Sequence, residues 1–195
     1  MKTCKEMVTE FHKLNGSVID EPSSGPHVAV LRSRLILEEF AETYSALHEE
    51  NAIEVADGLT DLLYVIYGTA VSYGVQCSDV FIDPAYPPVK IFWRADVLSF
   101  CIAVLPRLQR VITELLSESH AGLESGLIDL VKLICEFSAM WSFPMAELFA
   151  EVHRSNMTKT LTGNTASGEK YGSANSKGPG YSPPDIAGVL KLAHK

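Results

Sequence analysis

The stretch Glu54-Val-Ala-Asp57-Gly-Leu-Thr-Asp61-Leu-Leu-Tyr64-Val-Ile-Tyr-Gly68 decides the fold class of this chain. Glu54, Asp57 and Asp61 recur at intervals of three and four residues, which places them on one side of a helix. That side continues into Tyr64 and Gly68, which have the character of core positions. Carboxylates that face an interior raise the free energy of the fold unless a cation neutralises them. The stretch therefore predicts a helix that carries part of a metal site.

The preceding segment, residues 32–42 (RSRLILEEFAE), repeats this arrangement. Its acids Glu39 and Glu42 are three residues apart and share a helix face. The apolar spacing predicts one long helix over residues 27–50 and a second over residues 52–73. A connection this short favours antiparallel packing of the two helices. The two carboxylate faces should then lie opposite each other.

The rest of the chain also has helical rather than alternating apolar spacing, so the predicted fold is all-α. Further helices are expected over residues 2–14, 90–118, 123–142, 144–159 and 185–194. Pro106 should kink or divide the helix in which it lies. Residues 160–184 are rich in Gly, Ser, Asn, Thr and Pro, and should form a loop or an extended arm.

The composition limits the classes of function that this chain can have. The net charge of -8 argues against binding of a nucleic-acid polymer, which needs a basic surface. The charge does permit a nucleotide, because magnesium can carry phosphates to an acidic site. The four cysteines form no CxxC pair and should be reduced thiols packed in the protein, not zinc ligands.

The chain has the composition of a folded cytoplasmic protein. Hydrophobic residues make up 47% of its 195 residues, which is enough for a packed core. No apolar run reaches the ~18 residues that suggest a membrane-spanning helix, and no signal peptide is evident. We expect a single domain over residues 1–195 that acts in the cytoplasm without membrane contact.

The predicted metal site offers only carboxylate oxygens, which suits magnesium or manganese rather than zinc or copper. One acidic motif alone is more often a solvated helix face, but two on consecutive helices favour a metal. A ferritin-like di-iron site needs Glu-x-x-His pairs. None of the six histidines lies three residues after a glutamate, which argues against that alternative.

Two motifs, Glu39-Phe-Ala-Glu42 and Glu54-Val-Ala-Asp57, resemble the ExxE and ExxD motifs of the all-α nucleoside triphosphate pyrophosphatases. This MazG-like superfamily also contains phosphoribosyl-ATP pyrophosphohydrolase. The resemblance continues over residues 57–70, 149–159 (FAEVHRSNMTK) and 177–184 (KGPGYSPP). The last of these segments is similar to the C-terminal arm of the branch found in bacteria and phages.

The chain departs from compact members of that superfamily by an insertion over about residues 83–143. We expect the insertion to form a helical hairpin that packs on the core or on a partner subunit. The expected architecture is thus a MazG-like helical bundle with an inserted hairpin and an extended C-terminal arm, the latter over about residues 160–195.

The resemblance implies a magnesium-dependent enzyme that cleaves nucleoside triphosphates between the α- and β-phosphates, with manganese as a substitute metal. The products are a monophosphate and pyrophosphate, the role is nucleotide-pool control, and purine deoxynucleotides are candidate substrates. The implied metal ligands are Glu39, Glu42, Glu54 and Asp57. Glu38 is either a further ligand or the base that activates water, a catalytic role for which Glu39 is the other candidate. Asp61 is expected to support the ligands.

Substrate contacts are implied for Arg154, Asn156, Lys159, Lys177 and Tyr181. The basic groups could meet phosphates, Asn156 could bind sugar or phosphate, and Tyr181 could stack on a base. The alternatives are ordinary surface charge, a helix-terminal polar residue and an unbound tail.

Two arginines, Arg32 and Arg34, precede the acids and are expected to stabilise them by ion pairing. Members of the superfamily pair helices between subunits, so a homodimer or homotetramer is expected. If the chain is encoded by a phage, the expected compartment is the cytoplasm of the host.

The resemblance leaves two alternatives to this activity. One alternative is a phosphoribosyl-ATP hydrolase, against which the long arm and residues 149–159 argue. The other is a non-catalytic helical module that binds a protein through the hairpin. A pure scaffold, however, has no need to hold repelling acids together.

Overall fold

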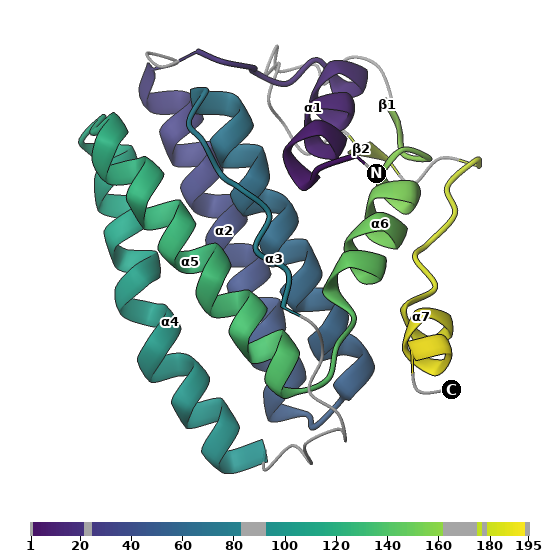
Figure 1. The fold of residues 1–195 in the computed structure, drawn as a ribbon. Helices are drawn as coiled ribbons and strands as arrows, with labels where there is room; N and C mark the ends of the chain where they lie inside the picture. The colour runs from purple at the N-terminus through teal and green to yellow at the C-terminus, as the bar shows by residue number, and fades with distance from the viewer. Residues whose placement is uncertain (1, 22–24, 83–92, 162–174, 177–178, 194–195) are drawn as a thin grey trace.

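Seven helices and one pair of short strands form the described part of the computed structural model, which covers residues 2–21, 25–82, 93–161, 175–176 and 179–193 (Figure 1). The two helices that carry the acidic motifs, α2 (Gly25–His48) and α3 (Ala52–Tyr73), pack against each other in antiparallel orientation. The all-α prediction is confirmed, since the strands are only two residues long.

The bounds of α3 follow directly from its flanking residues. The side chain of Asn51 accepts hydrogen bonds from the N–H groups of Ile53 and Glu54, at 3.2 and 3.4 Å, and so caps the first turn. Gly74 ends the helix with φ 68°, a left-handed conformation that glycine adopts without strain. The prediction of a helix over residues 52–73 is confirmed.

The N-terminal helix α1 (Cys4–Asn15) packs across α3 and α6. It begins with a capping box, in which Thr3 Oγ1 accepts the Glu6 N–H at 3.2 Å and the Glu6 carboxylate accepts the Thr3 N–H at 2.7 Å. This arrangement satisfies two backbone groups that the first turn leaves unpaired. The predicted helix near the N-terminus is therefore confirmed.

The insertion forms a hairpin of two helices, α4 (Trp93–Leu116) and α5 (His120–Met140). Contacts with α2 and α3 hold this hairpin on the core (Figure 1). Packing on the core was one of the two expected arrangements, the other being packing on a partner subunit. The helix α4 runs through Pro106 as one element, so a division of the helix there is wrong, whereas the expected kink stays a prediction. Residues 83–92, with which the predicted insertion begins, lie outside the described residues.

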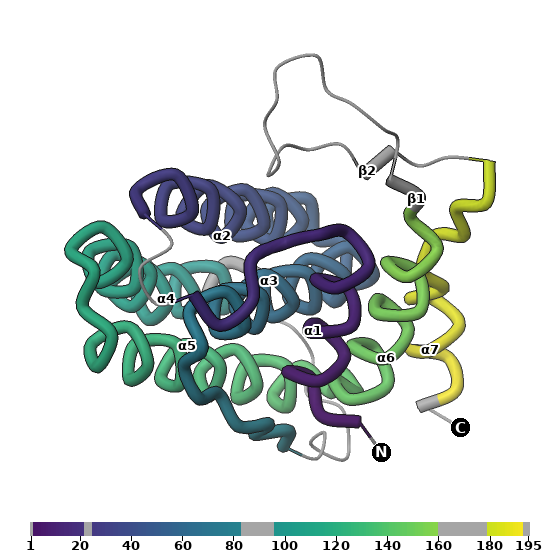
Figure 2. Tube along the Cα trace, turned by 90° about the horizontal axis from the view of Figure 1, so that it is seen from above, coloured from purple at the N-terminus to yellow at the C-terminus, as the bar shows by residue number. Residues whose placement is uncertain are grey.

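The C-terminal part lies beside α3, where α6 (Met145–Asn156) and α7 (Ile186–Ala193) pack side by side (Figure 2). Between them, β1 (Thr160–Leu161) pairs antiparallel with β2 (Asn175–Ser176), an element that the expected loop did not include. A ladder of two residues is too short to produce a period-two apolar pattern.

One contiguous apolar core joins all of these helices, and α3 is buried along most of its length. The hairpin contributes Phe100, Phe137 and Trp141, whose rings contact one another. All four cysteines are free, and Cys4, Cys77 and Cys135 are buried, as expected. None of the helices in the described ranges combines the length and apolar character needed to cross a membrane.

Candidate metal and nucleotide site

The acidic faces of α2 and α3 meet because the two helices are in close contact beside them. A Cβ atom placed on Gly58 would lie 2.8 Å from Thr43 Oγ1 and 3.0 Å from Thr43 Cα. Gly58 follows Asp57 in the chain and Thr43 follows Glu42, and the charges of both acids raise the pKa values of Glu39 and Asp61, so both lie within electrostatic reach of the same two side chains. The Thr43 hydroxyl is itself held within α2, where it donates to the carbonyl of Glu39 at 2.8 Å.

Three acids, Glu39, Asp57 and Asp61, form the inner part of the site together with Lys159. Burial and then the charge of Glu42 raise the pKa of Glu39 to about 7, while Lys159 acts in the opposite direction. Burial followed by the charge of Asp57 raises the pKa of Asp61 well above its usual value. Carboxylates crowded in this way favour any positive charge placed among them.

The outer part of the site consists of Glu42 and Glu54, which are both exposed. They line one hollow of about 340 Å³, together with Ala41, Ser45, Ala46 and Glu49. The charge of Glu42 also raises the pKa values of Glu39 and Asp61. Glu42 therefore connects the outer hollow with the inner acids.

The fit of this site to a divalent cation rests on its donor chemistry. All the acids offer oxygen ligands, and their mutual repulsion is what a hard cation would relieve. Within the described ranges, no group of three or more His, Cys, Asp or Glu side chains is already arranged to hold a metal ion. The donor set fits magnesium, and the side chains would have to converge on it.

The exposed acid Glu38 forms an ion pair with Arg34, with 3.4 Å between Arg34 Nε and Glu38 Oε1. The expected pairing of Arg34 with the acidic cluster is thus confirmed. Both side chains are 51% exposed, so water screens the pair and its contribution to stability is small.

The other arginine, Arg32, does not pair with the acids, and the expectation that it would is wrong. Its guanidinium is buried, where Nε donates to Thr69 Oγ1 at 3.1 Å and Nη2 donates to the Val65 carbonyl at 2.5 Å. Gly68 makes room for it, because a Cβ there would lie 3.1 Å from Arg32 Cζ. Burial lowers the pKa of Arg32 to about 10. This arginine therefore holds α2 against α3.

Two predicted substrate contacts, Asn156 and Lys159, lie at and just after the end of α6. Asn156 is buried at the last turn, and its carbonyl accepts the Lys159 N–H at 3.0 Å. The partly buried Lys159 lowers the pKa values of Glu39 and Asp61, so its charge lies close to both. A third predicted contact, Lys177, lies outside the described residues.

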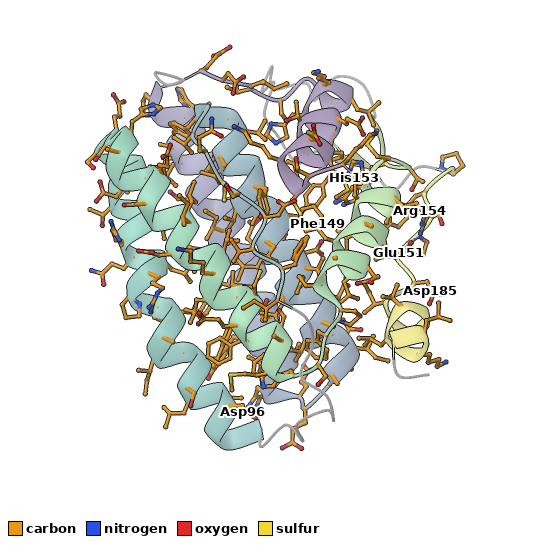
Figure 3. All side chains as sticks on the ribbon, viewed as in Figure 1. Asp96, Phe149, Glu151, His153, Arg154 and Asp185 are labelled. Carbon is orange, nitrogen blue, oxygen red and sulfur yellow. The ribbon has the colours of Figure 1, made fainter. Side chains whose placement is uncertain are left out.

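Two further predicted substrate contacts, Arg154 and Tyr181, lie where α6 meets the C-terminal segment. Arg154 donates to both carboxylate oxygens of Glu151 at 2.9 and 2.7 Å, to Ser182 Oγ at 3.1 Å and to the Pro183 carbonyl at 2.8 Å. Tyr181 lies near Arg154, since its charge raises the pKa of that guanidinium. Figure 3 shows Arg154 and Glu151 on the side of α6 that faces α7. In this arrangement Arg154 fastens the C-terminal segment to α6.

Sequence reasoning did not assign a role to Tyr64, His153 and Glu10, whose side chains lie in line across three helices. The Tyr64 hydroxyl lies 3.0 Å from His153 Nδ1, and His153 Nε2 lies 3.5 Å from Glu10 Oε2. Burial raises the pKa of the Tyr64 hydroxyl, and the nearby Asn156 side chain acts in the opposite direction. The available signals were Tyr64 one turn after Asp61 and His153 one turn before Asn156.

Comparison with known families agrees with the predicted resemblance. Residues 8–83 match the family model described as phosphoribosyl-ATP pyrophosphohydrolase, a family of the MazG-like all-α nucleoside triphosphate pyrophosphatase superfamily. The matched segment contains α2 and α3 with the predicted metal ligands, and it ends before the hairpin. The resemblance is therefore confirmed, and the match supports a pyrophosphohydrolase-like function.

A viral protein is similar to a larger part of the chain. The "Uncharacterized protein L479" of Acanthamoeba polyphaga mimivirus is 26% identical over 149 residues. The alignment covers 69% of this chain and 59% of the relative, so the chain spans about three fifths of that relative's length. No solved structure matches this chain.

Proposed function

We propose that this chain is a divalent-metal-dependent pyrophosphohydrolase that cleaves nucleoside triphosphates between the α- and β-phosphates. The observation that carries the proposal is the approach of the acidic faces of α2 and α3 at Gly58 and Thr43, with Lys159 beside the inner acids. A polyphosphate would be repelled by carboxylates alone, so this arrangement suits a substrate that arrives with a cation.

The proposed ligands are Glu39, Glu42, Glu54 and Asp57, through their carboxylate oxygens, for magnesium or for manganese in its place. When bound, the cation would neutralise phosphate charge and polarise the bond to be cleaved. Asp61, deeper among the inner acids, would support the ligands and keep Lys159 in position. The charge of Lys159 near both Glu39 and Asp61 supports this last role.

Each of two neighbouring glutamates could accept the proton of the attacking water. Glu38 is exposed on α2, which gives it access to solvent water. Glu39 has a pKa of about 7, near the range in which a general base works well, but a bound cation would displace its proton. Lys159 would donate to phosphate oxygens, and Asn156 would hydrogen-bond sugar or phosphate.

The proposed substrates are ribo- or deoxyribonucleoside triphosphates, with purine deoxynucleotides as candidates, and the proposed role is control of the cytoplasmic nucleotide pool. A second candidate substrate is phosphoribosyl-ATP, which the family match over residues 8–83 favours. Both substrates contain the same α–β phosphoanhydride. The carboxylate set therefore serves either reaction, and groups outside residues 8–83 would distinguish them.

Release of pyrophosphate from a panel of triphosphates and phosphoribosyl-ATP, measured with and without magnesium, tests the proposal. We expect magnesium-dependent turnover of at least one compound and equimolar monophosphate and pyrophosphate. Glu42→Gln should abolish this turnover. Glu136→Gln, which removes an exposed charge from α5, should leave it unchanged. Absence of turnover across the whole panel would exclude the enzyme and leave the non-catalytic helical module.

We also propose that the chain is a homodimer or homotetramer. Apolar side chains are exposed along neighbouring faces of α2 and α4: Val30, Leu37, Tyr44, Leu98, Ile102, Leu105 and Leu116. Val30, Leu37 and Leu116 line one hollow, and exposed apolar surface of this kind is typical of a protein interface. Light scattering coupled to size exclusion should give a dimer or tetramer mass, and Ile102→Glu should lower that mass.

A further inference from the structure

We propose that two copies of this chain pair through α4 of the inserted hairpin, with the two α4 helices antiparallel and related by a two-fold axis level with Arg107. This pairing rests on the proposed homo-oligomer and adds to it the helix, the orientation and the residues that meet. The metal site takes no part in it, so the pairing and the hydrolysis can be tested separately.

Five apolar residues and one glutamine of α4 form a stripe along the helix, here called the α4 stripe. They recur at alternating intervals of four and three residues, which is the spacing that joins two helices in a coiled coil. At 3.6 residues per turn, all six positions point within about 40° of one direction. Four of the apolar side chains are 48–66% exposed. The stripe consists of Leu98, Ile102, Leu105, Gln109, Ile112 and Leu116.

The α4 stripe is separate from the face with which α4 packs on the rest of the molecule. That buried face is turned by about 120° from the stripe. Its residues are at most 2% exposed, namely Phe100, Val104, Leu108, Val111 and Leu115. The helix contacts α2 and α5 and lies at the outer edge of the bundle, away from α6 and α7 (Figure 1). Packing among the described residues therefore explains the buried face but not the stripe.

The α4 stripe matches itself in antiparallel orientation. Its positions lie two, five and nine residues on either side of Arg107, so the spacing is the same from both ends. An antiparallel pair also sets the positive end of each helix dipole beside the negative end of the other. The pairs across the two-fold axis are Leu98 with Leu116, Ile102 with Ile112, and Leu105 with Gln109 of the partner subunit.

Charge favours a second copy of this chain at this face. With a net charge of -8, two copies repel each other at long range. The α4 stripe contains no charged residue, and its exposed flank consists of Ser99, Pro106 and Thr113. The neighbouring hollow between α4 and α2 is lined by one cation and one anion, the paired Arg34 and Glu38. Two copies can therefore meet here with little repulsion.

The size of this surface is sufficient for a dimer. From Leu98 to Leu116 the stripe is about 27 Å long, at about 1.5 Å per residue. Beside it, α2 exposes Val30, Leu37 and Tyr44 at intervals of seven residues. Two such helix faces are about 20 Å wide together. The flat area of roughly 540 Å² per copy reaches the about 500 Å² that a specific interface needs on each partner.

Disulfide cross-linking of the full chain tests the orientation. Cys101→Ser serves as the background, because Cys101 is the one cysteine that is not buried. Leu98→Cys and Leu116→Cys are purified separately, mixed under reducing conditions and then oxidised. The mixture should give a covalent dimer with one copy of each variant, and neither variant should cross-link with itself. Cross-linking of each variant only with itself would show parallel pairing and overturn the inference.

Two charge substitutions on opposite sides of the same helix locate the interface by sedimentation equilibrium. Ile102→Glu places an unpaired charge in the stripe and should raise the dimer Kd at least about tenfold. Arg107→Glu faces away from the stripe and should leave the Kd unchanged. Gln109→Leu removes the one polar side chain of the stripe and should lower the Kd.

The outcomes distinguish this pairing from the proposed homo-oligomer. A dimer whose Kd is the same in the wild type and Ile102→Glu, with no mixed cross-link, would overturn the pairing and leave the oligomer. A monomeric wild type would overturn both, and would leave the α4 stripe to a different protein. Neither result would change the test of the proposed hydrolysis, which is the release of pyrophosphate.

Discussion

Gly58 of α3 lies so close to Thr43 of α2 that a Cβ atom on it would sit 2.8 Å from the threonine hydroxyl oxygen. The backbone Cα of Thr43 would be only 3.0 Å away, so no rotation of the threonine side chain could remove the clash. The chain neighbours of these two residues are Asp57 and Glu42, both proposed metal ligands. Stability and the site therefore depend on the same contact between helices.

We expect Gly58→Ala to force α2 and α3 apart and to lower the free energy of unfolding by about 1–3 kcal/mol, the usual range for overpacking. Turnover should fall as well, because the acidic faces separate with the helices. Urea denaturation followed by far-ultraviolet circular dichroism measures the first effect. Gly180→Ala is the control, since nothing lies within 4 Å of a Cβ at that position. Equal midpoints for Gly58→Ala and the wild type would contradict the prediction.

Divalent cations should stabilise the folded protein, because they relieve the repulsion among the acids of α2 and α3. At a magnesium concentration one hundred times Kd, the gain should be about 2.7 kcal/mol, which differential scanning fluorimetry detects as a higher melting temperature. A chelator should reverse the shift. Glu42→Gln should lose the shift while folding normally, whereas Glu136→Gln should keep it. A wild type that is indifferent to magnesium and manganese would argue against the metal site.

The two arginines near the start of α2 should respond differently to the same substitution. Arg32→Lys gives up the fork that reaches both Thr69 and Val65, and should cost about 1.5–3 kcal/mol of unfolding free energy. Arg34→Lys changes only an exposed ion pair and should cost less than about 0.5 kcal/mol. Chemical denaturation of both variants gives the comparison. Similar losses would mean that the buried guanidinium is not specifically required.

The features that could be predicted from the sequence are those that short segments determine. Asn51 and Gly74 bound α3 through local capping, and the spacing of acids set which helix faces would meet. The buried position of the Arg32 side chain could not be predicted in this way, because it depends on the space that Gly68 leaves on another helix. Charge alone suggested a partner among the acids, but packing placed the guanidinium elsewhere.

The contacts from Glu10 through His153 to Tyr64 were beyond sequence reasoning for a related reason. These residues come from three helices, and Glu10 and His153 lie far apart in the sequence. No spacing rule joins them, because only the packing of α1 against α6 brings them together. The candidate ligands were predictable since each pair lies within one helical turn.

In the metal-free protein, the acid cluster should make stability depend on pH. The pKa of Glu39 is raised from 4.5 to about 7, so the folded state binds more protons than the unfolded state between these values. Protonated Glu39 therefore contributes to the free energy of unfolding. This contribution is fully present below about pH 4.5 and is lost as pH rises through about 7. Asp61, whose pKa is also raised, acts with the same sign.

Buried His12 changes the pH dependence of stability with the opposite sign. Its effect is the same in the wild type and in a Glu39 variant, so it cancels in the difference between the two proteins. Burial lowers the pKa of His12 from 6.5 to about 4, so its contribution is present above pH 6.5 and is lost as pH falls through about 4. The stability of the wild type minus that of Glu39→Gln, measured with a chelator from pH 4.5 to 7.5, should therefore decrease as pH rises. Magnesium should flatten this difference, since the cation favours the ionised carboxylate. Parallel curves for the two proteins without metal would show that Glu39 titrates as an ordinary exposed acid and does not belong to the inner part of the site.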